Sequence, residues 1–344
     1  MKQKNKHIVF LVPGFAESKT DTTCIPALQI YAADLQKHPT YEISIITFHY
    51  PTKKGLYYWN GIPVYALGGA KSFSKIILWK KAFQTLSHIH TTKIITNLHS
   101  FWLGECAFVG HWFSKKNNIS HITTLMGQDA LKGNFYSKIL PLKKMKLISL
   151  SDFHQKTFYS NYNISAEIIP WGICMENFHP SEKTIDIIGI GSLIPLKNYT
   201  LFIDIIHRIH AVHPVQVVLI GDGILKSELQ KKIRLHGLEN AITIKGELDH
   251  KETLNYLSQS KILLHTSDYE SFGLVFAEAL QSNTMIVSKP VGCYFNSPNW
   301  TTSNDKKEMA EACLSFLSKS FTENEQNSFT IENTVQSYLK VYNE

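Results

Sequence analysis

Short runs of apolar, mostly β-branched residues alternate with helix-length amphipathic segments along the whole chain, and this alternation limits the possible folds more than any other feature. The runs occupy residues 8–12, 43–48, 93–98, 121–125 and 147–150, then 185–190, 216–220, 242–245, 262–265 and 285–288. Helical spacing covers residues 27–35, 201–210, 225–236 and 251–258. Strands separated by helices indicate βαβ units and parallel sheets. The pattern therefore predicts an α/β protein with helices on both sheet faces.

Two such series in 344 residues predict two doubly wound, Rossmann-like domains. We expect an N-terminal domain over residues 1–170 and a C-terminal domain over residues 171–328. A helical segment within residues 329–344 can cross back to the first domain. Ligands bind beyond the carboxyl ends of the strands in open α/β sheets, so a cleft between the two domains is the expected site.

The positive charge is concentrated in the first half of the chain. Residues 1–170 contain 20 Lys, no Arg and 8 acidic residues, whereas residues 171–344 contain 15 basic and 20 acidic residues. A basic half predicts an anionic partner. An anionic membrane surface or a phosphate-bearing acceptor fits better than nucleic acid, because no nucleic-acid-binding module is recognisable. The alternative is a lysine-rich surface that is merely solvated.

The hydropathy pattern predicts a cytoplasmic protein that can contact the inner face of the membrane peripherally. No run approaches the roughly 18 to 20 apolar residues of a membrane span. The charged start Met1–Lys6 leads directly into the first predicted strand, with no small-residue cleavage site of a signal peptide.

The stretch after residues 262–265 contains the most informative side chains. A glycine there lets the backbone approach a ligand closely, and the free N–H groups that open a helix bind anions such as a diphosphate. One glutamate before the helix and one inside it can reach a sugar and a ribose on either side of the phosphates. The alternative is an ordinary amphipathic helix with two solvated glutamates. The residues are Glu270, Ser271, Phe272, Gly273, Leu274 and Glu278.

Two loops that contain glycine come earlier in the second half. Gly191, Ser192 and Lys197 follow the run at residues 185–190. A lysine there can pair with phosphate oxygens and stabilise a leaving group that gains charge. Gly221 and Gly223 follow the run at residues 216–220 and suit a close approach of the backbone to a nucleotide. Taken singly, each loop can equally be an ordinary surface turn.

Together these elements resemble the family-4 retaining glycosyltransferases of the GT-B architecture, also called glycosyl transferases group 1. The resemblance covers most of residues 7–343 and is strongest over residues 166–290. Residues 168–173 are similar to the family's domain-junction segment, and the pair Glu270 and Glu278 is similar to its paired-glutamate motif.

The resemblance implies a role for each motif residue. Glu270 would contact the donor sugar near the reacting centre, and Glu278 would bind the ribose hydroxyls. Lys197 would hold the donor diphosphate together with the backbone N–H groups of Gly273 and Leu274. The expected reaction is a retaining transfer from a UDP- or GDP-linked sugar to a glycan or lipid-linked acceptor, in cell-surface polysaccharide or glycoconjugate synthesis. It needs no cofactor and no metal ion; no two aspartates stand two positions apart, as they do in a metal-binding Asp-x-Asp triplet.

Several positions depart from the family pattern. Ser192 stands where an arginine is usual, and loss of a charge-assisted phosphate contact costs about 1.5–3 kcal/mol unless another group replaces it. Met126 stands where many relatives have a histidine, so either Gln128 or Asp129 contacts the sugar instead or that contact is absent.

Two further candidates in the first domain follow predicted strands. Gly14 is a single glycine where relatives often show two, and His99 is a candidate acceptor or donor-sugar contact, with a packed core histidine as the alternative.

Two other functions stay open: a nucleotide-sugar epimerase of the same architecture, and a catalytically silent homologue that binds nucleotide sugars.

Overall fold

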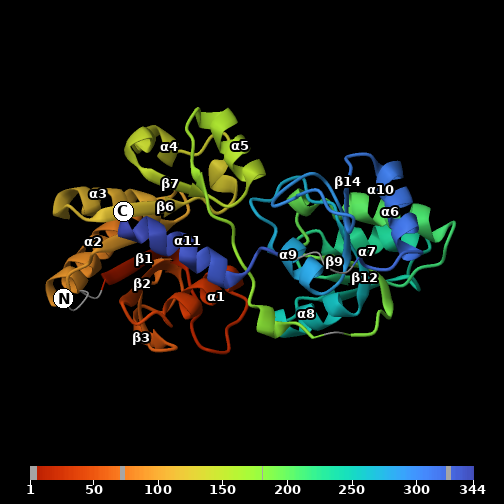
Figure 1. Ribbon diagram of the computed structural model, residues 1–344, viewed down its shortest axis with the longest axis horizontal. Coiled ribbons are helices and arrows are strands. Elements are labelled where there is room, and N and C mark those ends of the chain that lie inside the picture. Colours follow the sequence, from red (N-terminus) through yellow and green to blue (C-terminus); the bar gives the residue numbers. More distant parts are fainter. Residues whose placement is uncertain (1–5, 70–73, 180, 323–326) are drawn as a thin grey trace. The chain divides into compact units, whose positions relative to one another are not determined.

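The computed structural model describes residues 6–69, 74–179, 181–322 and 327–344, and it divides the chain into two compact units. Unit 1 combines Met1–Gly172 with Ile331–Glu344, and unit 2 is Ile173–Thr330. The C-terminal helix α11 (Ile331–Asn343), blue in Figure 1, therefore belongs to unit 1. Residues 1–5 of the charged N-terminal start lie outside the described residues.

Unit 1 is built on an eight-stranded sheet in the order β3-β4-β2-β1-β5-β6-β7-β8 (Figure 1). Val9 and Leu11 of the central strand β1 join an apolar cluster with α2 and α3, whereas Phe10 packs against Tyr31 and His99 on the opposite face. Because both faces are covered, β1 is apolar along most of its length. The strands are β1 (Lys6–Gly14), β2 (Tyr41–Tyr50), β3 (Gly55–Trp59), β4 (Ile62–Ala66), β5 (Asn97–Phe101), β6 (Ser120–Thr124), β7 (Lys146–Ser149) and β8 (Glu167–Ile168).

Buried hydroxyl groups fix α11 in unit 1. The Oη atom of Tyr342 lies 2.6 Å from Nδ1 of His99 and 2.8 Å from Oη of Tyr31. The Oη atom of Tyr338 lies 2.9 Å from Oγ1 of Thr124. Buried polar groups require partners, so these contacts specify where α11 lies. The other helices of unit 1 are α1 (Pro26–Leu35), α2 (Lys75–Thr92), α3 (Glu105–Asn117), α4 (Tyr136–Ile139) and α5 (Asp152–Tyr162).

Unit 2 contains a six-stranded, fully parallel sheet in the order β11-β10-β9-β12-β13-β14. The strand order reverses between β9 and β12, and ligands of such sheets bind beyond the carboxyl ends of strands at that point. The strands are β9 (Ile185–Ile190), β10 (Val217–Ile220), β11 (Ile242–Gly246), β12 (Ser260–His265), β13 (Met285–Ser288) and β14 (Trp300–Thr302). The helices are α6 (Tyr199–His210), α7 (Lys226–Leu235), α8 (His250–Ser258), α9 (Leu274–Gln281) and α10 (Lys306–Leu317).

The predicted fold class, two α/β units with largely parallel sheets, is confirmed, but some strands differ from the prediction. The strand predicted at residues 93–98 lies at Asn97–Phe101, because its polar residues Asn97, His99 and Ser100 are buried with partners. The hairpin of β3 and β4 was not predicted. Its turn, Asn60 and Gly61, has φ angles of 47° and 86°, and Asn-Gly is a known hairpin signal. Within the described residues, no helix combines the length and apolar character needed to cross a membrane.

Candidate functional site

The loops that follow β9 and β12 are tied together where the strand order reverses. The N–H of Asp268 donates to the carbonyl oxygen of Leu196 at 2.9 Å, and Oγ1 of Thr266 donates to the carbonyl oxygen of Lys197 at 3.0 Å. Lys197 closes a short 3-10 turn, and Asn198 then caps α6 with its side chain. These bonds hold Lys197 against the loop that leads into α9.

Glu270 lies between Lys197 and His265. Its Oε1 atom accepts a hydrogen bond from Nζ of Lys197 and lies 3.2 Å from Nε2 of His265, the last residue of β12. The Glu270 side chain is 14% exposed and that of His265 is 4% exposed. A carboxylate, an ammonium group and an imidazole therefore share one largely buried position.

The protonation states of this cluster follow from burial and mutual contact. Burial raises the pKa of Glu270, but the hydrogen bond and charge of His265, with the Lys197 ammonium, outweigh it and lower the pKa to about 2. Burial lowers the pKa of His265 below its ordinary value, although Glu270 acts in the opposite direction. At neutral pH Glu270 is therefore a carboxylate, which accepts the Nε2 proton of His265. The Nδ1 atom of His265 is buried without a hydrogen-bond partner in the described part of the chain.

Helix α9 begins four residues after Glu270, at Leu274. The preceding residue, Gly273, has a φ of 78°, and a Cβ atom there would lie 2.6 Å from the ring of Phe276. Only glycine fits this conformation and this space. Because the N-cap is a glycine, it supplies no side-chain oxygen to the start of the helix. The N–H of Phe276 donates to the carbonyl oxygen of Gly273 at 2.9 Å, whereas those of Leu274 and Val275 have no intrahelical acceptor. These N–H groups and the helix dipole favour an anion at this position.

Glu278, on the same helix, is held by a histidine from α8. Its Oε1 atom lies 2.7 Å from Nε2 of His250, and the Glu278 side chain is 7% exposed. Burial lowers the pKa of His250, but the Glu278 carboxylate more than reverses this effect, so that the pKa is raised. The pair fixes the orientation of the Glu278 carboxylate.

Gly221 and Gly223 allow the loops after β9 and β10 to touch. A Cβ atom at Gly221 would lie 2.0 Å from the carbonyl oxygen of Gly191, and one at Gly223 would lie 2.6 Å from that of Leu193. The N–H of Leu193 donates to the carbonyl oxygen of Asp222 at 2.9 Å. These glycines thus shape the loop at which Ser192 is exposed.

Two candidate residues of unit 1 are buried. His99 has no exposed surface, and its Nδ1 and Nε2 atoms lie 2.6 Å from Oη of Tyr342 and 2.7 Å from Oγ1 of Thr124. Both ring nitrogens are used inside unit 1, so His99 acts as a core residue in this arrangement. Gly14 is the buried last residue of β1, and a Cβ atom there would lie 3.3 Å from the Cβ atom of Tyr50.

Asp129 shapes the loop that follows β6. Its carboxylate accepts backbone N–H groups from Leu103 at 2.8 Å, Gly127 at 2.6 Å and Met126 at 3.1 Å. Burial is the largest influence on the pKa of Asp129 and raises it despite these donors. Gln128, beside it, is exposed. Of the two residues, Gln128 has the side chain available to a ligand.

The sequence patterns did not indicate His265 and His250 as site residues. Each contacts one of the two motif glutamates: His265 stands five residues before Glu270 and His250 stands 28 residues before Glu278, and no spacing rule connects either pair. The position of His265 at the carboxyl end of a predicted strand was the only signal. Among the described residues, no group of three or more His, Cys, Asp or Glu side chains is placed to hold a metal ion.

Comparison with known proteins connects this geometry to a family. Residues 175–330 match the family model described as glycosyl transferases group 1. The GPI3 subunit of phosphatidylinositol N-acetylglucosaminyltransferase from Saccharomyces cerevisiae is 31% identical over 137 residues, which span 36% of this chain and 30% of that relative. An uncharacterized glycosyltransferase from Methanocaldococcus jannaschii is 25% identical over 228 residues, 64% of each chain.

Solved structures share the fold at low sequence identity. Sucrose-phosphate synthase from Thermosynechococcus elongatus superposes with a TM-score of 0.76 and 16% identity, covering 98% of both chains. HepE from Anabaena, in complex with UDP and glucose, superposes with a TM-score of 0.66 and 16% identity, covering 98% of this chain and 95% of that one.

Proposed function

We propose that this chain moves a sugar from a nucleoside diphosphate to a glycan or lipid-linked acceptor. The premise is that it is a glycosyltransferase whose residues 175–330 belong to the glycosyl transferases of group 1. The transfer retains the anomeric configuration and requires no metal ion or other cofactor. Its product enters a cell-surface polysaccharide or glycoconjugate. One observation carries the proposal: Lys197, His265 and Glu270 meet just before the open end of α9, where the strand order of unit 2 reverses.

The donor diphosphate fits the start of α9. An ammonium group has three donors, so Lys197 can keep its bond to Glu270 and still donate to phosphate oxygens. Ser192, exposed on the neighbouring loop, adds a neutral hydrogen bond. The Glu278 carboxylate, oriented by His250, accepts the ribose hydroxyls.

The reaction uses these groups electrostatically. The bond from the anomeric carbon to the diphosphate oxygen breaks while the acceptor oxygen bonds to the same face of that carbon, and the acceptor proton passes to the departing phosphate. Lys197 and the α9 N–H groups stabilise the negative charge that develops on the phosphate. Glu270 is ionised at neutral pH because its pKa is lowered to about 2, and it accepts hydrogen bonds from the sugar and stabilises positive charge near the anomeric carbon.

The relatives favour a particular donor and acceptor. The structure of HepE contains UDP, which makes UDP the first nucleotide to test. The yeast relative is named for transfer of N-acetylglucosamine to phosphatidylinositol, which favours a lipid-linked acceptor. A lipid acceptor, together with the 20 lysines of residues 1–170, supports a cytoplasmic protein that works at the inner face of the membrane.

A transfer assay tests the proposal. The full chain is incubated with radiolabelled UDP- and GDP-sugars, a membrane lipid extract and a chelator, and the anomeric linkage of any product is determined. We expect labelled, retained product from the wild type, and Glu270→Gln should reduce turnover by about two to three orders of magnitude. Glu239→Gln, on the exposed surface of unit 2, is the matched control and should leave turnover unchanged.

Three outcomes would contradict the proposal. Isomerised donor without an acceptor would indicate an epimerase, and donor binding without any transfer would indicate a silent homologue. Wild-type turnover of Glu270→Gln would remove the assigned role of that carboxylate.

A further inference from the structure

The segment between β6 and β7 carries concentrated, unpaired positive charge. Residues 131–145, here called the lysine segment, contain four lysines, and no acidic residue lies between Asp129 and Asp152. The four ammonium groups are exposed and make no ion pair with any residue that the structure describes. By contrast, Lys146 and Lys156, just beyond the segment, are both paired with carboxylates. The lysines of the segment are Lys132, Lys138, Lys143 and Lys144.

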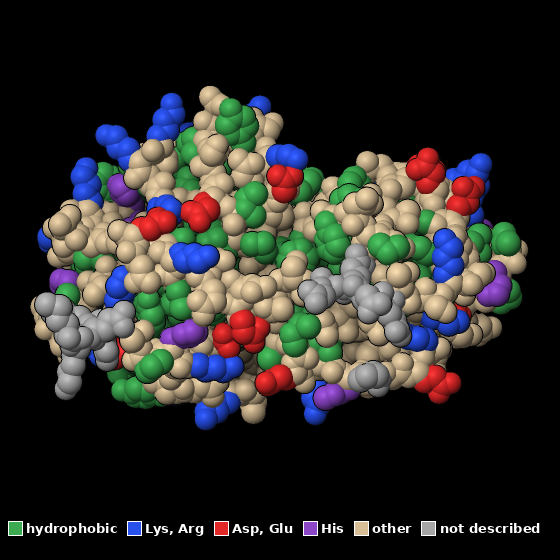
Figure 2. Space-filling model, in the orientation of Figure 1, with side chains coloured by type: hydrophobic (Ala, Val, Ile, Leu, Met, Phe, Trp, Pro, Cys, Tyr) green, Lys and Arg blue, Asp and Glu red, His purple; other side chains and the backbone are tan. Residues whose placement is uncertain are grey.

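Exposed apolar side chains lie among these lysines. Phe135 is 61% exposed and Ile139 is 37% exposed, at and within the short helix α4. Leu140 and Leu142 are buried and anchor the segment to the core. Figure 2 shows hydrophobic and lysine side chains reaching the surface together over the part of unit 1 that carries α3, α4 and α5.

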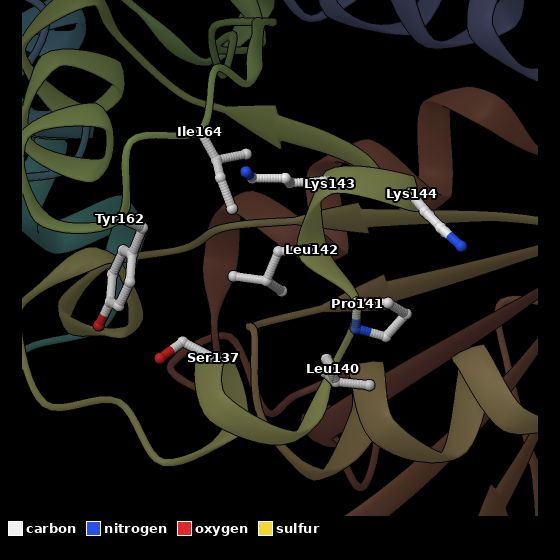
Figure 3. Close-up of a pocket in the computed structure, with 8 residues that line it drawn as sticks. All are labelled: Ser137, Leu140, Pro141, Leu142, Lys143, Lys144, Tyr162 and Ile164. Atoms are coloured by element: carbon white, nitrogen blue, oxygen red, sulfur yellow. The ribbon is translucent and has the colours of Figure 1, made fainter.

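A cavity of about 330 Å³ opens within the lysine segment. Its walls are mainly apolar, with contributions from Leu142, Tyr162 and Ile164. In Figure 3 the Lys143 side chain extends across the cavity towards Ile164, whereas Lys144 points away from it. The cavity thus combines an apolar interior with an ammonium group at its edge.

We propose that the lysine segment docks unit 1 on the surface of an anionic lipid bilayer. The inference rests on the proposed lipid-linked acceptor and names the surface that brings the enzyme to it. Anionic lipid headgroups complement the lysines, and each lysine near such a surface contributes about 1 kcal/mol, or roughly fivefold in partitioning. Phe135 and Ile139 enter the boundary between headgroups and acyl chains, where their exposed area is removed from water. A soluble phosphate ligand would use the lysines but would leave these two apolar side chains exposed.

A second exposed apolar pair competes with this assignment. Ile76 and Ile77, in the first turn of α2, are 73% and 54% exposed. The neighbouring Lys75, however, lies 3.8 Å from the Glu105 carboxylate, so this surface is partly neutralised. The observations therefore favour the lysine segment, and Ile76 and Ile77 serve as the comparison in the experiment.

Vesicle flotation with the full chain tests the lysines. The vesicles are phosphatidylcholine alone, or equal parts of phosphatidylcholine and phosphatidylglycerol. We expect binding only to the anionic vesicles, weakening as salt is raised, and a loss of about a hundred-fold when Lys138, Lys143 and Lys144 are replaced by Gln. The control removes the same charge from exposed positions of unit 2 and should bind as the wild type does. The control positions are Lys231, Lys251 and Lys306.

The apolar side chains are tested separately in the same assay. Phe135→Ser with Ile139→Ser should reduce anionic-vesicle binding, whereas Ile224→Ser with Leu235→Ser, which are 81% and 83% exposed in unit 2, should not. The proposal is overturned if the lysine variant binds as tightly as the wild type, or if neutral vesicles bind equally well. It is also overturned if Ile76→Ser with Ile77→Ser, and not the lysine-segment variants, abolishes binding.

Calorimetric titration of UDP and GDP into the same preparations separates this inference from the proposed function. The lysine-segment variants should bind nucleotide as the wild type does, because the segment lies in unit 1 and the candidate nucleotide site lies in unit 2. Vesicle binding without nucleotide binding would refute the proposed function but leave the docking surface in place. Nucleotide binding without vesicle binding would refute the docking surface alone.

Discussion

Replacing Glu270 by Gln should change the pH dependence of folding stability. In the folded protein the pKa of Glu270 is lowered from 4.5 to about 2 by His265 and Lys197, against the effect of burial. A lowered folded-state pKa stabilises the fold above the unfolded pKa, and this stabilisation is lost as the pH falls through the folded pKa. The difference between the unfolded and folded pKa values of Glu270 corresponds to about 3 kcal/mol of unfolding free energy at neutral pH. Glutamine keeps the shape of the side chain but cannot carry the charge.

Denaturant unfolding, followed by circular dichroism from neutral pH down to about pH 2.5, measures this effect. The wild type should be more stable than Glu270→Gln by about 3 kcal/mol at neutral pH. The gap should begin to close as the pH falls below about 4.5, because the carboxyl group of the unfolded chain then takes up a proton while that of the folded protein stays ionised down to about pH 2. Glu239→Gln controls for loss of an exposed carboxylate. A constant gap, or identical profiles for the wild type and Glu270→Gln, would refute the ionic contacts assigned to Glu270.

Three further substitutions probe separate parts of the account. Glu278→Gln should abolish the preference for UDP over 2′-deoxy-UDP, which we expect to be about ten- to a hundred-fold in the wild type, as measured by calorimetry; an unchanged preference would exclude a ribose contact. His265→Phe should lower turnover by up to about a hundred-fold with unchanged affinity for UDP, because Glu270 loses the group that orients it; a weakened affinity with normal turnover would contradict this role. Tyr342→Phe should lower the unfolding free energy by about 2 kcal/mol, since it leaves the buried partners on His99 and Tyr31 unsatisfied, whereas Tyr58→Phe, 68% exposed, should not.

The fold was largely predictable because its information is local. Continuous Val, Ile and Leu runs mark strands that are covered on both faces, and β9 and β13 begin and end at the predicted residues. The strand β5 was misplaced because its buried polar residues find partners far away in the sequence. Asn97 bonds to the carbonyl oxygen of Tyr342, a contact that no local pattern indicates.

The candidate site was predictable only in part, for the same reason. Helix termini and glycine turns are local features, so Lys197, Glu270 and Gly273 could be named from their positions after strands. The contacts of Glu270 with His265 and of Glu278 with His250 depend on how α8, α9 and β12 pack. His99 and Asp129 follow predicted strands just as the site residues do, and only tertiary structure shows that their polar atoms are used within unit 1.

The central claim is that unit 2 holds the diphosphate of a nucleotide between Lys197 and the start of α9. Calorimetric titration of UDP and GDP into the wild type and Lys197→Ala measures this contact directly, with Lys231→Ala as the control for loss of an exposed lysine. We expect Lys197→Ala to bind the preferred nucleotide about ten- to a hundred-fold more weakly, the worth of a charge-assisted hydrogen bond. Equal affinity of Lys197→Ala and the wild type would contradict the account.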